Sequence, residues 1–324
     1  MDGKGFSSLT RNKRSHVTIS IQHLIERNKV KRRQAQRINQ MVPFLLKGIA
    51  SVSIIVTIAI VITLANETIA FFQKVSVVSF FTEKEWLPFF ETPKFGVLPL
   101  IYGTILVTVI AMLVAVPIGL GCAIFLSEYA SNGVRKVLKP LLELLAGIPT
   151  IVYGFFALTV VTPLLQKIIP NLQFFNAVSP GIVMGIMIVP TIASLSEDAM
   201  RAVPNRLREA SYAIGATRFE TMRKIVLPTA LTGIASAIVL GASRAIGETM
   251  IVVIAGGATP NLSAHPTESI QTLTAYIVQV SLGDAPYGTT TYYSMYAVGA
   301  TLFIFTLVMN IIAQYIMRRF KEAT

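Results

Sequence analysis

Cysteine, histidine and charged residues are all scarce in this sequence of 324 residues. The single cysteine, Cys122, excludes an intrachain disulfide and any metal site built on several cysteines. The three histidines, His16, His23 and His265, are too few and too widely spaced to form a metal cluster. Charged residues make up only 14% of the chain, whereas soluble domains usually carry about 25%. These scarcities exclude an ordinary soluble domain, a disordered chain and a disulfide-rich secreted domain.

Motifs for nucleotide binding and for catalysis are missing as well. No G-x-x-x-x-G-K-[ST] sequence occurs, so this chain carries no phosphate-binding loop of its own. No nucleophile elbow, metalloprotease motif or pair of candidate catalytic carboxylates can be identified. We therefore expect a protein that is not an enzyme, with no catalytic residue, no metal site and no cofactor of its own.

Hydrophobic residues, in contrast, make up 53% of the chain and gather into long runs. Each run is long enough to cross about 30 Å of hydrocarbon as a helix, so we predict six transmembrane helices. They cover residues 44–65, 98–126, 141–165, 179–197, 229–256 and 296–317. Pro117, Pro149 and Pro190 interrupt three of these runs, which favours a bundle packed around a pathway over a simple anchor. The predicted fold class is an all-α membrane protein.

Lysine and arginine are distributed unevenly among the connecting segments, which predicts the orientation of the spans. Residues 1–47 carry eleven, and residues 127–140, 198–228 and 318–324 carry three, six and three. The alternate loops carry three, one and none. We therefore expect a multi-pass membrane protein with both termini in the cytoplasm. The net charge of +12 follows from this topology and requires no nucleic-acid partner.

The chain is predicted to have two parts. Residues 1–42 form a basic cytoplasmic tail without the shape of a signal peptide. The tail is either a solvated segment that helps to fix orientation or, over residues 19–40, a basic helix lying on anionic lipid. Residues 43–320 form the six-helix membrane domain.

The loop between the fourth and fifth spans, residues 198–228, contains the most informative pattern; we call it the coupling loop. Pro204 and the residues after it predict a short helix over 205–214, and Gly215 suits a left-handed helix end. A second short helix is predicted over 217–226, before Pro228 opens the next span. Two short helices parallel to the membrane can dock on a partner and move with it.

The spacing in the coupling loop resembles the EAA loop (E-A-A-x3-G-x9-I-x-L-P) of ABC-importer permeases. The matching residues are Glu209, Ala210, Ser211, Gly215, Ile225, Leu227 and Pro228, with Ser211 in place of the second alanine. The resemblance implies the type I importer permease fold, with a cytoplasmic coupling helix that seats on a separate ATPase. ATP and Mg²⁺ would then be bound by that ATPase, and the resemblance implies a location in the inner (plasma) membrane of a bacterium. The alternative is a re-entrant amphipathic loop without a special role.

Further runs resemble the PstC-type permease of phosphate importers, over about residues 40–320. They are residues 95–104, 115–119, 123–130, 145–158 and 244–249. This resemblance implies that the chain forms half of a translocation pathway for inorganic phosphate, completed by a second, PstA-type permease. It also implies a PstB-type ATPase dimer and an extracytoplasmic PstS-type binding protein, which would dock on the outer segments 66–97 and 257–295.

Two charged residues, Arg244 and Glu248, lie within the predicted fifth span. A charge inside the bilayer is costly, so each should face protein or water. Arginine offers a planar fork of donors that suits the oxygens of phosphate. Because the two residues are four apart on one predicted helix, we expect them to pair when no anion is present. Ser243 and Thr249 add hydroxyls to this pathway site; the alternative is an ion pair that only holds the bundle together.

Three more acidic residues, Glu143, Glu197 and Asp198, are expected near the cytoplasmic surface and paired with loop arginines. Other functions remain open at this stage. They are an ABC permease for another oxyanion such as molybdate or sulfate, a secondary anion symporter with Glu248 as its proton-linked group, and a receptor that signals through its basic tail.

Overall fold

The computed structural model describes residues 41–262 and 265–322, with the side chains of the last helix described to residue 315. The chain divides into two compact units, residues 1–63 and 64–324. In the first unit, residues 41–63 are helical and belong to the helix Met41–Phe72. The predicted basic tail lies almost wholly outside the described residues, and the division at residue 42 stays a prediction.

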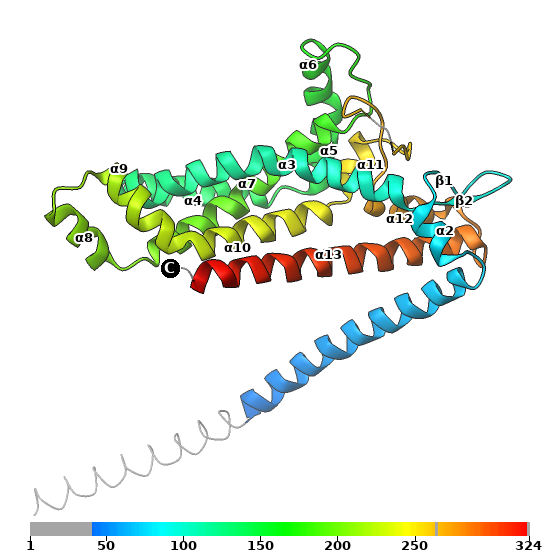
Figure 1. The fold of residues 1–324 in the computed structure, drawn as a ribbon, viewed down its shortest axis with the longest axis horizontal. Helices are drawn as coiled ribbons and strands as arrows, with labels where there is room; N and C mark the ends of the chain where they lie inside the picture. The colour runs from blue at the N-terminus through cyan, green and yellow to red at the C-terminus, as the bar shows by residue number, and fades with distance from the viewer. Residues whose placement is uncertain (1–40, 263–264, 323–324) are drawn as a thin grey trace, which may run out of the picture. The chain divides into compact units, whose positions relative to one another are not determined.

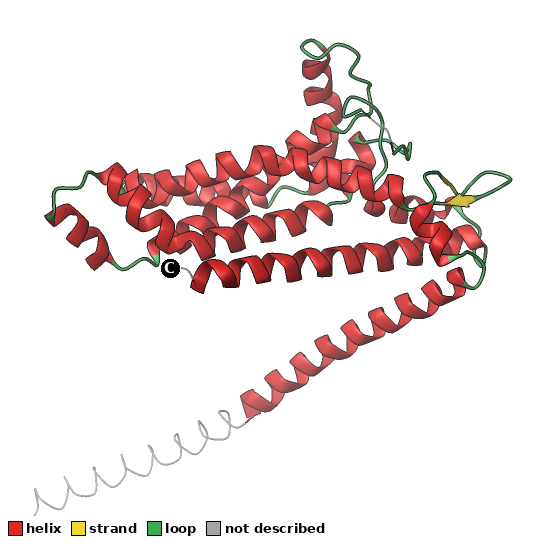
Figure 2. Cartoon of the chain, viewed as in Figure 1, coloured by secondary structure: helices red, strands yellow, loops and turns green. Residues whose placement is uncertain are grey.

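Four long helices run side by side in the second unit (Figure 1). They are α3 (Leu98–Ile124), α7 (Val178–Arg201), α10 (Leu227–Ile246) and α13 (Thr290–Glu322). Helix α7 packs on α3 and on α10, and α10 also packs on α13. Figure 2 shows that the chain between these helices is mostly helical too.

Shorter elements complete the second unit. In chain order they are α2 (Val77–Thr82), β1 (Trp86–Leu87), β2 (Lys94–Phe95), η1 (Phe125–Tyr129), α4 (Asn132–Ala146), α5 (Thr150–Phe156), η2 (Ala157–Val161), α6 (Thr162–Gln166), α8 (Asn205–Ala213), α9 (Arg218–Thr221), η3 (Met222–Val226), α11 (Met250–Ala255), α12 (Leu273–Gln279) and η4 (Val280–Asp284). Elements η1, η2 and η3 are single π-helical turns, and η4 is interrupted by Gly283, whose φ of +108° is not helical.

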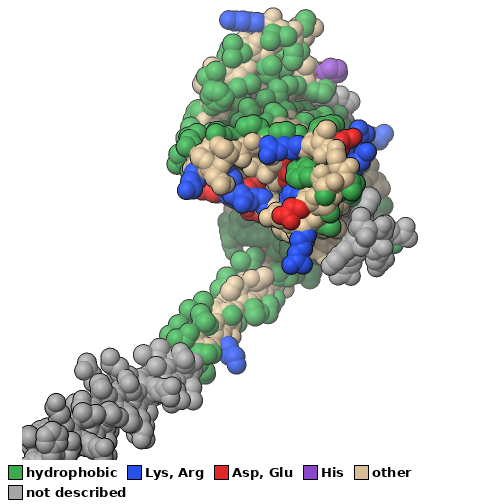
Figure 3. All heavy atoms as spheres, turned by 90° about the vertical axis from the view of Figure 1, so that its left-hand side faces the viewer, with side chains coloured by type: hydrophobic (Ala, Val, Ile, Leu, Met, Phe, Trp, Pro, Cys, Tyr) green, Lys and Arg blue, Asp and Glu red, His purple; other side chains and the backbone are tan. Residues whose placement is uncertain are grey.

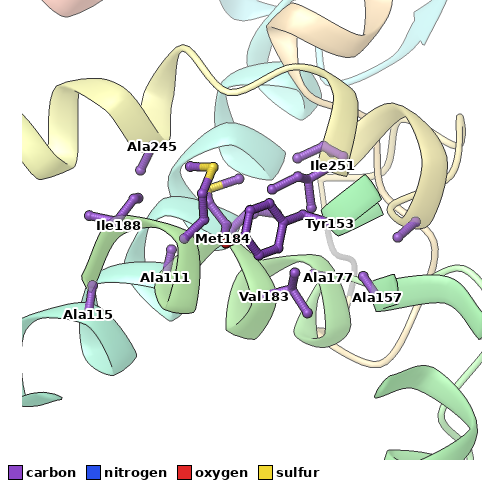
Figure 4. Close-up of a cluster of buried hydrophobic side chains, with 14 of the residues drawn as sticks. Ala111, Ala115, Tyr153, Ala157, Ala177, Val183, Met184, Ile188, Ala245 and Ile251 are labelled. Atoms are coloured by element: carbon purple, nitrogen blue, oxygen red, sulfur yellow. The ribbon is translucent and has the colours of Figure 1, made fainter. Parts of the chain in front are cut away.

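Glycines bring α3 and α7 into close contact. A Cβ atom on Gly185 would lie 2.7 Å from the carbonyl oxygen of Ala111, and one on Gly119 would lie 2.9 Å from the Ile192 Cβ. Small residues of this kind let helices approach closely in a bilayer, where packing rather than water drives association. The buried side chains of Ala111 and Met184 lie in this core, which Figure 4 shows together with Tyr153 and Ile251.

Among the described residues, five helices are long and apolar enough to cross a membrane, and a bent pair makes a sixth candidate. The five are Met41–Phe72, Leu98–Tyr129, Val178–Arg201, Arg218–Ile246 and Thr290–Tyr315. Four of the predicted spans, those beginning at residues 44, 98, 179 and 296, are therefore confirmed as long apolar helices.

The predicted third span, 141–165, is wrong as a single helix. Helix α4 ends at Ala146, and α5 starts at Thr150 after a bend of 85° between the segments Asn132–Ala146 and Thr150–Gln166. Pro149 lacks the N–H that a continuous helix needs and disfavours a helical conformation at the residue before it, which explains the break. The two segments form either a broken span or a re-entrant loop.

The predicted fifth span, 229–256, is also interrupted. Its helix starts eleven residues earlier, at Arg218, and stops at Ile246, and α11 follows only at Met250. The predicted second short helix over 217–226 is wrong as a separate element, since α9 and η3 continue directly into α10. Pro228 lies in the first turn of α10, directly after the π-helical turn η3. A π-helical turn shifts the backbone hydrogen bonds from the usual i→i+4 pattern, which accommodates Pro228 because proline has no N–H to donate.

The two ends of the bundle differ in character. At the end opposite α8, strands β1 and β2 pair antiparallel, and Trp86 packs edge-on against Tyr276 with ring centroids 4.8 Å apart (Figure 1). Helix α12 carries Tyr276, and the first four of its seven residues are buried there. The loops at residues 130–131 and 202–217 and the end of α13 lie at the other end, which agrees with the predicted alternation of the loops.

Candidate functional site

The first half of the coupling loop folds as its sequence predicts. Helix α8 starts after Pro204 and ends at Ala213, Ile214 is its C-cap, and Gly215 has a φ of +86°. A Cβ atom on Gly215 would have no neighbour within 4 Å, so glycine is favoured there by backbone conformation and not by a lack of space. Glu209 and Ala210 are exposed on α8.

The second half of the coupling loop starts a long helix. Thr217 caps α9 in a capping box: the Glu220 N–H donates to Thr217 Oγ1 at 3.3 Å, and the Thr217 N–H donates to Glu220 Oε2 at 2.9 Å. Ile225 and Leu227 are half-buried in the turns that follow, and Pro228 is exposed. The turn after α8 therefore leads through α9 and η3 into α10 without a break in the helix.

Ser211, the residue that departs from the EAA pattern, joins the two halves of the loop. Its hydroxyl lies 2.8 Å from the hydroxyl of Thr221, and the two side chains are buried. Alanine at position 211 would leave the buried Thr221 hydroxyl without this partner, which has a free-energy cost. The serine thus adds a hydrogen bond between α8 and α9 that the alanine of the pattern cannot make.

Arg208 fastens α8 to the membrane helices. Its guanidinium donates to the carbonyl oxygens of Met200, at 2.8 Å, and Val203, at 2.6 Å, at the end of α7. It also pairs with Glu128 at 3.0 Å, and both side chains are largely buried, with exposed fractions of 13% and 4%. Since Glu128 lies in η1, directly after α3, this one side chain connects α8 to the ends of two long helices.

Apolar side chains project from the coupling loop into solvent. Leu207, Tyr212, Ile214 and Phe219 are exposed, with 86% exposure at Ile214. Lys and Arg side chains gather on the same end of the molecule, with Asp and Glu side chains among them (Figure 3). Exposed apolar residues rimmed by charges mark an interaction surface.

The second predicted site lies where the fifth long helix breaks. Arg244 is in the last turn of α10, and its Nη1 donates to Thr191 Oγ1 of α7 at 3.1 Å. Its side chain is exposed, and within the described residues it forms no ion pair with a carboxylate. Most of its five donors therefore remain available for an anion.

The predicted ion pair between Arg244 and Glu248 is absent from the described structure. Glu248 is buried, and its Oε1 accepts from the backbone N–H of Met250 at 3.2 Å and of Ile251 at 3.5 Å. The spacing rule for pairs four residues apart holds only within one helix, and α10 ends at Ile246. Glu248 instead places its negative charge at the start of α11, where a helix end favours it.

Ser243 and Thr249, the other two predicted pathway residues, flank the break but do not meet. The Ser243 hydroxyl donates to Asn310 Oδ1 of α13 at 2.9 Å, and the Thr249 hydroxyl donates to the Gly247 carbonyl at 3.2 Å. Thr274 of α12 donates to the Glu248 carbonyl oxygen at 2.9 Å. The break is thus held by hydrogen bonds to α7, α12 and α13.

The acidic residues near the end of α7 form ion pairs with basic side chains, and their position at the cytoplasmic surface stays a prediction. Glu197 is fully buried and lies 2.7 Å from Arg135 and 3.0 Å from Lys139, both on α4, while Asp198 lies 2.9 Å from Lys139. Glu143, predicted to behave likewise, is exposed and forms no ion pair with any described residue.

Two residues of the site, Thr191 and Asn310, could not be predicted from the sequence. Thr191 and Asn310 hold the break through contacts across 53 and 67 residues of sequence, which no local spacing can reveal. A signal existed for Asn310, an amide within an apolar stretch of α13, and for Thr191 in the run Pro190-Thr191-Ile192 that repeats Pro149-Thr150-Ile151.

Comparison with known proteins gives the family. The sequence profile of the "Binding-protein-dependent transport system inner membrane component" family matches residues 115–322. A probable ABC transporter permease protein, YqgH of Bacillus subtilis, is 38% identical over 274 residues, covering 84% of this chain and 88% of that protein. The phosphate transport system permease protein PstC of Mesorhizobium japonicum is 35% identical over 268 residues, covering 76% of this chain and 80% of that protein.

Solved structures share the fold. A bacterial alginate ABC transporter in complex with an alginate-bound periplasmic protein matches with a TM-score of 0.60 and 19% identity, covering 85% of this chain and 94% of that chain. The MetNI methionine ABC transporter in an inward-facing conformation matches with a TM-score of 0.55 and 20% identity, covering 68% of this chain and 94% of that chain. The predicted importer permease fold is therefore confirmed.

Proposed function

Because this chain belongs to the family of binding-protein-dependent transport system inner membrane components, we propose that it is the permease subunit of an ATP-driven importer of inorganic phosphate. The observation that carries the transport role is the coupling loop, which exposes an apolar surface at one end of the bundle and continues covalently into α10. Relatives named as phosphate transport permeases, at 32–36% identity, support phosphate as the substrate.

The proposed complex has four kinds of subunit. A second, PstA-type permease completes the pathway, and a PstB-type ATPase dimer, which binds ATP and Mg²⁺, seats on the surface formed by Leu207, Tyr212, Ile214 and Phe219. Both termini of this chain then lie in the cytoplasm, in agreement with the lysine and arginine distribution.

An extracytoplasmic PstS-type binding protein docks at the opposite end. A cavity of about 670 Å³ lies there between the β1 hairpin and residues 260–262. Beside it, Lys94 lies 2.6 Å from Glu85, and the hydrogen bond and charge of Glu85 raise the pKa of Lys94. A hairpin held in this way offers a partner a fixed surface.

Arg244 is the proposed contact for phosphate inside the membrane. Its guanidinium is charged at any physiological pH and matches the oxygens of phosphate, whereas Glu248 is fixed at the start of α11 and stays beside the pathway. The anion is held weakly, since conduction requires that it leave again.

Uptake by the reconstituted complex tests this function. We expect ³²P-labelled phosphate to enter vesicles only when ATP is present on the ATPase side, and excess unlabelled phosphate to suppress the signal more than molybdate or sulfate does. Stronger competition by molybdate or sulfate would assign another oxyanion. Uptake that follows a proton gradient and survives without the ATPase would assign a secondary symporter.

A further inference from the structure

Two adjoining cavities are lined by residues of α4, at the end of the bundle that carries α8. One, of about 250 Å³, lies between α4 and α7 and includes Thr191, Ser194 and Glu197 in its lining. The other, of about 400 Å³, is lined by Arg135 and Lys136 among others. Lys139 and Glu143 line both cavities, so the two meet at one face of α4.

The inner cavity leads away from the proposed anion contact. Thr191, whose hydroxyl accepts the hydrogen bond from Arg244, is part of its lining. Thr191, Ser194 and Glu197 follow one another at three-residue spacing, which places them near one face of α7. A polar stripe therefore connects the contact of Arg244 with the cluster of charges at the end of α7.

Cations dominate the outer cavity. Arg135 and Lys139 are held by the buried carboxylate of Glu197, at 2.7 and 3.0 Å. Lys136 is exposed and has no ion pair among the described residues. An incoming oxyanion can bind the unpaired ammonium of Lys136 and can compete with Glu197 for Arg135 and Lys139. All three cations can donate hydrogen bonds to phosphate oxygens.

We propose that these cavities form a release site for the transported oxyanion. Arg135, Lys136 and Lys139 receive the anion after it leaves Arg244, and Glu197 holds Arg135 and Lys139 when the site is empty. The competition from Glu197 keeps retention weak, as release requires. This inference rests on the proposed function, which supplies the anion and the inward direction. A phospholipid headgroup shares the chemistry of phosphate, so the test separates the two.

A cysteine placed in the inner cavity reports directly on this site. The assembled transporter carries Ser194→Cys in a Cys122→Ala background and is reconstituted in neutral phosphatidylcholine vesicles with the ATPase side outward, without nucleotide. The rate of modification is measured with an anionic and a cationic thiol reagent of equal size, with and without inorganic phosphate at constant ionic strength. Ala202→Cys, an exposed position just after α7 that lines neither cavity, is the matched control.

We expect the anionic reagent to react about five-fold faster than the cationic one at Ser194→Cys, the effect of one nearby charge in a wet site. Phosphate should slow this reaction, adding Lys136→Gln should reduce the preference, and phosphate should have no effect at Ala202→Cys. Vesicles that also contain anionic phosphatidylglycerol should give the same protection by phosphate.

Three outcomes in a complex that still imports phosphate would overturn the release site and leave the proposed function intact. They are equal rates for the two reagents, no protection by phosphate, and no reaction at Ser194→Cys. Loss of protection in phosphatidylglycerol vesicles would make the lipid headgroup the occupant and overturn it as well. If the complex instead imports no phosphate while the anion preference persists, the proposed substrate fails and the release site stands for another oxyanion.

Discussion

At the scale of single residues, the break after Ile246 separates two charges that the sequence places together. Arg244 turns toward Thr191 on α7, and Glu248 turns toward the first N–H groups of α11. Gly247 ends the helix between them, so the two side chains leave the backbone in unrelated directions. Their roles are therefore separable by mutation.

Arg244→Gln should lower ATP-driven phosphate uptake by about ten-fold or more, since hydrogen bonds from a charged donor contribute roughly 1.5–3 kcal/mol. Arg244→Lys should keep part of the uptake, because the charge remains and the fork is lost. Lys167→Gln, an exposed lysine at the end of α6, serves as the matched control. Normal uptake by Arg244→Gln in a fully assembled complex would contradict the pathway role.

Glu248 should affect stability more than transport. Glu248→Ala removes the carboxylate that accepts from Met250 and Ile251, and we expect a loss of about 1 kcal/mol of stability, the usual value of a helix cap. Glu248→Gln keeps an acceptor oxygen and should lose less. Thermal unfolding of the purified complex measures both; equal stability of Glu248→Ala and the unchanged chain would refute the capping role.

At the scale of elements, two features of the coupling loop matter. One is the set of contacts that Arg208 makes with Glu128, Met200 and Val203, which we call the clasp, and the other is the turn at Gly215. The clasp ties α8 to the ends of α3 and α7, and the turn directs the chain from α8 into the long helix α9–η3–α10. Loosening either should leave the membrane helices folded while uncoupling them from the ATPase.

Breaking the clasp should uncouple hydrolysis from uptake. Removal of one partner from a buried ion pair leaves the other charge unpaired, at a cost of about 3–5 kcal/mol. We therefore expect Glu128→Ala to permit ATP hydrolysis with little phosphate uptake. The double variant with Arg208→Ala should be less destabilised than the sum of the two single variants; strict additivity in thermal unfolding would show that the pair is not coupled.

Gly215→Val should disturb the turn through its backbone alone. The left-handed conformation costs roughly 1–2 kcal/mol for a residue with a Cβ atom and more for a branched one, and no neighbour lies close enough to clash. Gly215→Asn, which tolerates this conformation, is the control and should retain coupling. Co-purification of the ATPase together with uptake measures the effect, and full coupling in Gly215→Val would disprove the requirement.

The same scale shows what local sequence can and cannot predict. Helix α8 and the turn at Gly215 follow from Pro204, from the helix-forming residues between and from the glycine, all within a dozen residues. The bend at residues 147–149 could not be predicted from hydropathy. The apolar residues on both sides of it form one continuous run, and hydropathy carries no information on the direction of a helix axis. A proline at the third position after a helix end was the available signal.

At the scale of the whole molecule, the length of the apolar runs predicted the long helices. The distribution of lysine and arginine predicted at which end of the bundle each connecting loop lies. Contacts between distant segments were beyond reach, because nothing local specifies that Arg208 meets Glu128 or that Ser243 meets Asn310. The coupling loop and the β1 hairpin lie at opposite ends of the bundle (Figure 1). This arrangement gives the proposed ATPase and the proposed binding protein separate docking surfaces joined by continuous helices.

Cross-linking tests most directly whether ATP-driven motion enters the membrane helices through the coupling loop. Ile214→Cys in a Cys122→Ala background places a thiol at the most exposed large apolar residue of that loop, and Leu282→Cys, exposed to a similar degree at the other end, is the control. We predict that Ile214→Cys cross-links to the ATPase, that the cross-link stops ATP-driven uptake, and that Leu282→Cys does neither. A transporter that imports phosphate while Ile214→Cys never reaches the ATPase would contradict the account.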